Sequence, residues 1–297
     1  MAEPKDAFRL DRPRLRASFD RASESYEAAA RLQAEVSAEL LSRLDAFDFA
    51  PKVVLDLGCG TGRVTRELKK RYPRALVIAL DLAPGMLRAA RHNQPLWRRF
   101  ARVCGDALRL PLQSASVDLV FSSLMLQWCE PLDAALAEVR RVLRPEGHFA
   151  FSTFGPDTLQ ELRAAWASVD ALTHVNRFID VHGVGESLTH AGLAEPVLDV
   201  DRIELGYPDT LTLMRDLKAI GAHNATAGRP RSLLGRGRLE RVSAAYEAFR
   251  HGAQLPATYE VIYGASWGAA GRPTKATAAR EVHIAVSDVR RLRSRPP

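Results

Sequence analysis

The stretch at 53–62, which reads VVLDLGCGTG, restricts the fold of this chain more than any other. Its first half is apolar except for Asp56, as a parallel strand buried on both faces requires, and residues 63–70 can continue as a polar helix. The glycines between them permit a tight turn and leave no side chain between the backbone and a ligand. A buried carboxylate is costly without a partner, and ligands of open α/β sheets lie at the carboxyl ends of the strands. The stretch therefore predicts a nucleotide-type cofactor site.

The glycine spacing alone is weak evidence, because dinucleotide-binding turns read G-x-G-x-x-G whereas this one reads G-x-G-x-G. Taken by itself, such a turn can be purely structural. A second apolar stretch at 75–80 leads into Asp81, about twenty residues after the glycines, where a carboxylate can accept both hydroxyl groups of a ribose. A third apolar stretch ends close to Asp106. Acidic residues at three successive strand ends favour the cofactor site over the structural turn.

This arrangement resembles the class I S-adenosylmethionine-dependent methyltransferases, and residues 116–122 and 138–148 are similar to later segments of the same fold. The resemblance implies a Rossmann-like α/β fold with a seven-stranded, mostly parallel sheet and an antiparallel edge pair. It implies S-adenosyl-L-methionine as cofactor and S-adenosyl-L-homocysteine as product, with Asp56 facing the methionine part, Asp81 the ribose and Asp106 the adenine amino group. The cofactor-binding residues that it implies are Asp56, Gly58, Cys59, Gly60, Gly62, Asp81, Leu82, Met86, Asp106, Ala107 and Ser122.

Composition narrows the class of protein. The chain has 297 residues of which 46% are hydrophobic, enough for a sizeable core, and we expect one elaborated domain. No apolar run is long enough to span a bilayer and the N-terminus has no apolar signal core, so we expect a cytoplasmic protein with no membrane partner. The three cysteines show no zinc spacing, so we expect free thiols and no metal site.

A leading helix is expected at 17–46, where apolar residues fall roughly on one stripe. In the methyltransferases that this chain resembles, such a helix closes over the cofactor, so Tyr26 could meet the methyl-donor end or could simply pack in the core. The methyltransferase domain is expected to occupy residues 17–267. Residues 1–16 and 268–297 are expected to be basic, disordered tails.

The second half of the domain is predicted to end in two strands. Alternating apolar segments at 196–205 and 258–267 are expected as the sixth and seventh strands, which pair antiparallel in this fold. The insertion between them, at about 206–255, is then expected to project at the substrate side as a lid. Helices are expected at 156–172, 183–191, 208–220 and 236–250.

The net charge of +7 and the pI near 9.6 indicate an acidic partner or substrate. The insertion contains eight Lys/Arg against four Asp/Glu. No recognisable nucleic-acid-binding module accompanies this charge, so we expect an acidic carrier protein and no nucleic acid. The basic residues of the insertion are Arg215, Lys218, Arg229, Arg231, Arg236, Arg238, Arg241 and Arg250.

Several short segments carry a closer resemblance. They read RASFDRA at 16–22, SY at 25–26, LQ at 32–33, LQWC at 126–129, HVNRF at 174–178, MRDLKAIGA at 214–222 and LPATY at 255–259. Together they resemble the malonyl-[acyl-carrier protein] O-methyltransferases, over about residues 15–267. This resemblance implies methyl transfer to the free carboxylate of a malonyl thioester, on an acyl carrier protein or on coenzyme A, as the first step of pimeloyl formation for biotin.

The chemistry of a carboxylate acceptor suggests catalytic roles. Model carboxyl groups have pKa values of about 3 to 4, so the nucleophile is already ionised at neutral pH and no general base is required. We hypothesise that Arg177 and Arg215, helped by Lys218, hold this carboxylate, because the planar guanidinium fixes a carboxylate and stays charged. The alternative is that the arginines only tie the lid down through ion pairs. Tyr26 completes the candidate catalytic set.

Two other functions remain open. A related family, the mitochondrial complex I assembly factor that hydroxylates an arginine, shares the leading helix, the Leu-x-Trp stretch and the Pro-Ala-Thr-Tyr segment. An RNA methyltransferase would suit the high pI, although Ser122-Ser123-Leu124 stands where base amino methyltransferases have Asn/Asp-Pro-Pro-Tyr.

Overall fold

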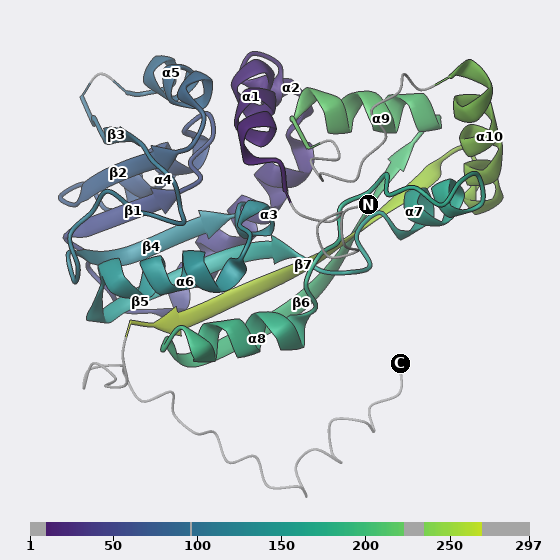
Figure 1. Ribbon diagram of the computed structural model, residues 1–297. Coiled ribbons are helices and arrows are strands. Elements are labelled where there is room, and N and C mark those ends of the chain that lie inside the picture. Colours follow the sequence, from purple (N-terminus) through teal and green to yellow (C-terminus); the bar gives the residue numbers. More distant parts are fainter. Residues whose placement is uncertain (1–9, 96, 223–234, 269–297) are drawn as a thin grey trace, which may run out of the picture.

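A computed structural model describes residues 10–95, 97–222 and 235–268 of the chain. They form a seven-stranded sheet in the order β3-β2-β1-β4-β5-β7-β6 (Figure 1). The pairs among the first five strands of this order are parallel, and β7 runs antiparallel to both β5 and β6, so the predicted fold class is confirmed. The strands are β1 (Val53–Leu57), β2 (Leu76–Asp81), β3 (Ala101–Cys104), β4 (Val117–Ser123), β5 (Leu143–Phe154), β6 (Ala194–Tyr207) and β7 (Leu255–Trp267).

The sequential order of the strands reverses at β1, which pairs with β2 on one side and with β4 on the other. Such a reversal opens a crevice at the carboxyl ends of the neighbouring strands, where open α/β sheets bind ligands. The glycine-rich turn predicted from the sequence follows β1 directly, and Asp81 is the last residue of β2. The fold therefore brings the predicted cofactor motifs to this crevice.

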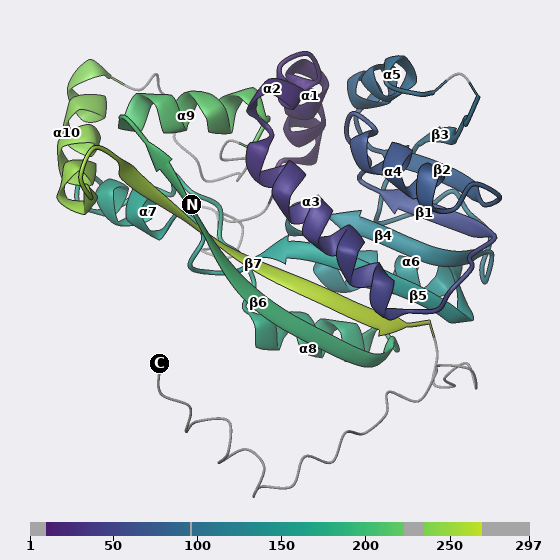
Figure 2. The same ribbon diagram turned by 180° about the vertical axis from the view of Figure 1, so that it is seen from behind.

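Helices cover both faces of the sheet because the strands alternate their apolar side chains between the two. Val54 packs in one core with α3, α4 and α5, whereas Leu55 packs in the other with α6 and α8. Figure 1 shows α6 and α8 over the near face, and Figure 2 shows α3 on the opposite face. These helices are α3 (Arg31–Arg43), α4 (Arg63–Arg71), α5 (Pro84–His92), α6 (Leu132–Val142) and α8 (Val181–His190).

The leading segment differs from the single helix expected at 17–46. It forms α1 (Arg12–Ala22), α2 (Tyr26–Ala29) and α3 in succession. The first helix starts earlier than expected because the side chain of Asp11 accepts a hydrogen bond from the Arg14 N–H at 3.2 Å and a proline stands in the first turn. Residues 12–16 thus belong to a helix, and residues 1–9 lie outside the described chain. In both views α1 and α2 lie between α5 and α9 (Figures 1 and 2).

The two strands predicted at the end of the domain are both present, and each is longer than expected. β6 and β7 pair from Ala194 opposite Trp267 to Tyr207 opposite Leu255. The insertion between them contains α9 (Thr210–Ala219) and α10 (Arg236–Tyr246), while residues 223–234, with Arg229 and Arg231, lie outside the described chain. Whether the insertion moves as a lid stays a prediction.

The helix expected at 156–172 is shorter in the structure, where α7 spans Gln160–Ala167. The residues before it bond to β7 instead of entering the helix. Leu159 donates its N–H to the Thr258 carbonyl at 2.6 Å, and the Thr158 hydroxyl donates to the Glu260 carbonyl at 3.1 Å. No helix within the described ranges is long and apolar enough to cross a membrane.

Candidate active site

A cavity opens at the carboxyl ends of β1, β2 and β4, beneath the leading helices. The residues after β1 and β2 line one side of it, and the segment after β4 lines the other. Its lining residues are Arg12, Leu15, Phe19, Tyr26, Gln33, Leu57, Gly58, Gly60, Leu80, Asp81, Leu82, Met86, Gly105, Asp106, Ala107, Leu108, Ser123, Leu124, Met125, Gln127, Trp128, Cys129, Phe154, Ile220 and Ala222.

The glycine turn needs glycine at its first position for two reasons. Gly58 has a φ of +79°, a left-handed conformation that side chains disfavour, and a Cβ added there would lie 2.2 Å from Cγ of Met125. The N–H groups of Gly58 and Cys59 both donate to the Leu80 carbonyl, at 2.8 and 3.0 Å. These bonds fix the turn against the end of β2, so the backbone of Gly58 and Gly60 faces the cavity.

Asp81 is held by the turn that it faces. One carboxylate oxygen accepts from the Gly60 N–H at 2.9 Å and the other from the Ala83 N–H at 2.8 Å. Burial raises the pKa of Asp81 above its ordinary value, although these backbone hydrogen bonds oppose the shift. Each oxygen keeps a lone pair, so the fixed carboxylate can accept from two neighbouring hydroxyl groups.

Asp106 lines the same cavity. Its carboxylate accepts from the Leu108 N–H at 3.0 Å and forms an ion pair with Arg12 of α1. Leu82, Met86 and Ala107 add apolar side chains to the lining. A flat aromatic group fits apolar walls with an acceptor at one edge, which is the chemistry of an adenine ring with its amino group.

Other predicted cofactor residues do not line the cavity. Asp56 is buried behind the glycine turn and accepts from the Thr65 hydroxyl; burial, reinforced by the charge of Asp81 and opposed by Thr65, raises its pKa to about 7. Ser122 donates to the Leu57 carbonyl at 3.0 Å, and its neighbour Ser123 lines the cavity in its place. The remaining two, Cys59 and Gly62, are buried within the turn.

Tyr26 lines the cavity from α2. Burial raises the pKa of Tyr26 well above its ordinary value, and the nearby carboxylates of Asp81 and Glu27 raise it further. Its hydroxyl therefore stays protonated at neutral pH and can donate a hydrogen bond, but it is not a ready base.

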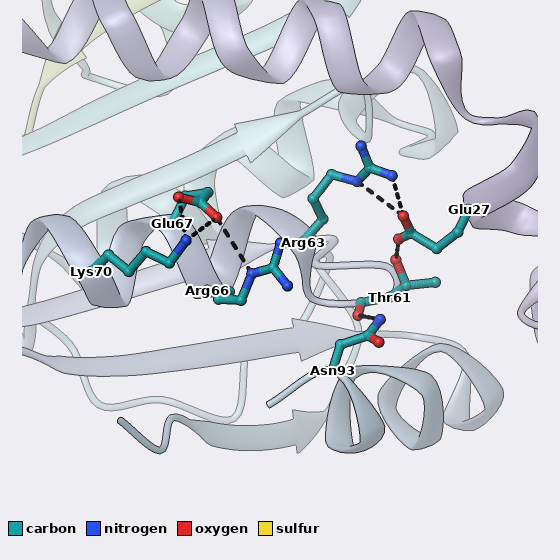
Figure 3. Close-up of polar contacts among 7 residues, drawn as sticks. All are labelled: Glu27, Thr61, Arg63, Arg66, Glu67, Lys70 and Asn93. Carbon is teal, nitrogen blue, oxygen red and sulfur yellow. Dashed lines mark hydrogen bonds and ion pairs between the residues drawn. The ribbon is translucent and has the colours of Figure 1, made fainter. Parts of the chain in front are cut away.

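Glu27, next in the chain, fastens α2 to the glycine turn (Figure 3). Its carboxylate accepts from the Thr61 hydroxyl and from the Arg63 guanidinium, whose Nε lies 3.0 Å away. On the far side, the Asn93 amide donates to the Thr61 carbonyl at 2.9 Å. The sequence does not predict this contact, because no motif or periodicity relates Glu27 to Thr61.

A second cavity adjoins the first, and among the residues that the structure describes the two share five lining residues: Gln33, Trp128, Phe154, Ile220 and Ala222. Aromatic side chains form much of its wall. Three exposed cations line it, Arg14 and Arg21 from α1 and Lys218 from α9, and within the described ranges none of them forms an ion pair. No Asp or Glu of the described chain lines this cavity. Its aromatic residues are Trp128, Phe154, Trp166, His174, Phe178 and Tyr259.

Known proteins similar in sequence show the family of this chain. Residues 55–151 match the family described as a methyltransferase domain. A malonyl-[acyl-carrier protein] O-methyltransferase from Laribacter hongkongensis (strain HLHK9) is 54% identical over 278 residues, which cover 91% of this chain and 94% of the relative. The relative of the same name from Methylovorus sp. (strain MP688) is 53% identical over 268 residues, covering 88% and 90%. The chain belongs to the malonyl-[acyl-carrier protein] O-methyltransferase family. It is a methyltransferase, of the class that uses S-adenosylmethionine.

Solved structures of lower identity share the fold of this methyltransferase. A SAM-dependent methyltransferase from Thermotoga maritima superposes with a TM-score of 0.52 at 15% identity, covering 86% of this chain and 99% of that one.

The predicted catalytic cations of this malonyl-[acyl-carrier protein] O-methyltransferase family member are not brought together. Lys218 lines the second cavity with Met214 and Leu217. Arg215 does not line this cavity; its side chain is exposed and donates to the Thr212 hydroxyl at 3.4 Å. Arg177 is exposed and lines a third hollow, which shares Phe154, Asn176 and Phe178 with the second cavity. Of the three predicted cations, Lys218 is therefore the one that lines the second cavity, and the catalytic roles of all three stay predictions.

Arg14 and Arg21 join Lys218 at the second cavity, and neither was among the predicted site residues. A spacing of seven residues returns to the same face of a helix, so their positions in α1 are a usable signal. Because Arg14 falls in the tail expected at 1–16, this signal was not used.

Proposed function

We propose that this enzyme transfers a methyl group from S-adenosylmethionine to the free carboxylate of a malonyl thioester on an acyl carrier protein. The relatives carry this activity in their name. The observation that carries the proposal is the second cavity, which adjoins the cofactor cavity and is lined by Arg14, Arg21 and Lys218 with no described carboxylate. Such a cavity favours an anionic acyl group. The reaction would open the synthesis of the pimeloyl part of biotin.

The residues of the first cavity fit the cofactor. We propose that Asp81 accepts from the ribose hydroxyls and Asp106 from the adenine amino group, while Leu82, Met86 and Ala107 flank the rings. The backbone of Gly58 and Gly60 would face the methionine part. Asp56, Cys59, Gly62 and Ser122 would shape the turn from behind. When bound, S-adenosylmethionine supplies an electrophilic methyl group on a positively charged sulfur.

The protein's own task is then to position the acceptor and to exclude water. A malonyl carboxylate is ionised at neutral pH, since carboxyl pKa values lie at about 3 to 4, so no side chain has to remove a proton. Tyr26, which stays protonated, can donate a hydrogen bond near the methyl-donor end. The aromatic walls of the second cavity displace water from the nucleophile, and Lys218, Arg14 and Arg21 supply the compensating charge.

The same charges give selectivity. An acetyl thioester lacks the carboxylate, so it gains nothing from these cations. The product ester is neutral, so the attraction that held the substrate is lost after transfer and release is favoured. The methyl ester, being neutral, can also enter an apolar acyl-chain pocket that would reject the charged carboxylate.

Methyl transfer to defined thioesters tests this function. Purified enzyme would be incubated with labelled S-adenosylmethionine and either malonyl-carrier protein or acetyl-carrier protein, followed by mild base. We expect label only with the malonyl substrate, and its release by base as methanol, which identifies a carboxyl ester. Label on both substrates, or label that resists base, would overturn the proposal.

A further inference from the structure

Gln33 stands at the junction of the two cavities. It lies in the first turn of α3 and is one of the five residues that line both the cofactor cavity and the second cavity. The other four include Trp128, whose indole N–H is the only other side-chain N–H among them; Phe154, Ile220 and Ala222 are apolar. A group that lies between the two cavities is therefore close to these five residues, Gln33 among them.

The amide of Gln33 has an unmet hydrogen-bonding requirement. Its Oε1 atom is buried and has no hydrogen-bond partner in the described part of the chain. A buried polar atom without a partner destabilises the protein, and natural proteins rarely keep one without a reason. Because the oxygen and nitrogen of an amide are nearly the same size, a half-turn of the amide places its N–H₂ group at the same point.

We propose that the Gln33 amide donates a hydrogen bond to one oxygen of the acceptor carboxylate and leaves the other oxygen unbound and facing the methyl donor. This role rests on the proposed function. A carboxylate only accepts hydrogen bonds, so it selects the N–H₂ orientation of the amide. A guanidinium fork can engage both carboxylate oxygens at once, whereas a single amide N–H engages one.

Gln33 and the cations have different tasks because they occupy different positions. Arg14, Arg21 and Lys218 line the second cavity but not the cofactor cavity, so they attract the anion at a distance from the methyl donor. Gln33 is placed to orient the carboxylate at the junction itself. A neutral donor there also withdraws less charge from the attacking oxygen than a cation would.

Binding measurements with matched variants test this assignment. Affinities for malonyl-CoA, acetyl-CoA and S-adenosylhomocysteine would be measured by calorimetry for the wild type, Gln33→Leu and Gln33→Glu, together with kcat/KM for methyl transfer. We expect Gln33→Leu to weaken malonyl-CoA binding about tenfold or more, as loss of a hydrogen bond to a charged group does, and to leave the other two affinities unchanged. Gln33→Glu should weaken it further, because it places like charges together.

Gln160→Leu is the matched control, because Gln160 is exposed and lines neither cavity. Unchanged malonyl-CoA affinity in Gln33→Leu would overturn the role of Gln33 but not the proposed function. An equal loss of S-adenosylhomocysteine affinity would do the same. Tighter S-adenosylhomocysteine binding by Gln33→Glu would assign the amide to the cofactor instead. A wild type that shows no preference for malonyl-CoA over acetyl-CoA and no methyl transfer would overturn the proposed function, and the role of Gln33 with it.

Discussion

Burial sets the charge state of His148, which lines neither of the two cavities. Its ring packs among Phe47, Phe49 and Trp267, with ring centroids 4.3, 6.5 and 4.8 Å away. Neither ring nitrogen has a hydrogen-bond partner within the described ranges. Burial lowers the pKa of His148 to about 4.

His148 should make folding stability depend on pH. The unfolded chain protonates His148 near pH 6.5, but the folded chain does so only near pH 4. The stability that the neutral ring gives to the folded state is therefore complete above pH 6.5 and is lost as the pH falls from 6.5 to 4. The loss amounts to about 3 kcal/mol, at about 1.4 kcal/mol for each unit of pKa. Urea unfolding at pH 7 and pH 4.5 would measure it, and His148→Phe should show a smaller drop than the wild type. An equal drop in both proteins would contradict the prediction.

Asp81 is the residue on which cofactor affinity should depend most. Asp81→Asn keeps the size but removes the charge, and its N–H₂ group would face either the Gly60 N–H or the Ala83 N–H, which now donate to the carboxylate. We expect the dissociation constant for S-adenosylhomocysteine to rise by about 10- to 100-fold, the range for losing a hydrogen bond to a charged group. Calorimetry would measure it. Unchanged affinity would exclude Asp81 from the cofactor site.

At the scale of elements, the leading helices are fastened over the cofactor cavity by separate contacts. Arg12 pairs with Asp106, Asp20 accepts from the Gly85 N–H, and Glu27 holds Thr61 and Arg63. Each contact joins α1 or α2 to a loop or to the first turn of a helix at the carboxyl edge of the sheet. The leading segment therefore forms one wall of the cofactor cavity.

The Glu27 contact should control cofactor release more than stability. Its ion pair with Arg63 is about 40% exposed on both sides, and such pairs contribute about 0 to 1 kcal/mol to folding. We expect Glu27→Gln to speed S-adenosylhomocysteine release several-fold with little change in melting temperature, measured by stopped-flow and thermal unfolding. The control is Lys70→Met, which breaks an exposed pair with Glu67 on the same helix (Figure 3). A similar release rate in both variants would contradict the role of Glu27.

Elements could be predicted from the sequence where local pattern and tertiary contact agree. The glycine turn after β1 and the acidic residues at Asp81 and Asp106 are local signals, and the structure places all of them at one cavity. The break between α1 and α3 was missed, because it depends on contacts with distant residues such as the hydrogen bond from Ser25 to the Ala219 carbonyl at 2.8 Å. The grouping of Arg14 with Lys218 was missed for the same reason.

At the scale of the whole molecule, the net charge of +7 should attract an acidic carrier protein. Arg236 and Arg241 are exposed on α10, outside both cavities. We expect Arg236→Glu with Arg241→Glu to raise KM for malonyl-carrier protein several-fold and to spare malonyl-CoA, with the difference shrinking at high salt. Equal slowing on both substrates would show that these arginines do not dock the carrier.

We propose that the cations of the second cavity recognise the carboxylate of the acceptor, and paired substitutions on α9 test this claim. Lys218→Met removes a cation from the cavity, whereas Arg215→Met removes an exposed cation from a neighbouring position that lines neither cavity. The measurement is KM for malonyl-CoA beside the dissociation constant for S-adenosylhomocysteine. We predict that Lys218→Met, combined with Arg14→Met, raises KM about tenfold or more with cofactor affinity unchanged, and that Arg215→Met changes neither. A parallel loss of cofactor affinity, or an equal effect of Arg215→Met, would contradict the claim.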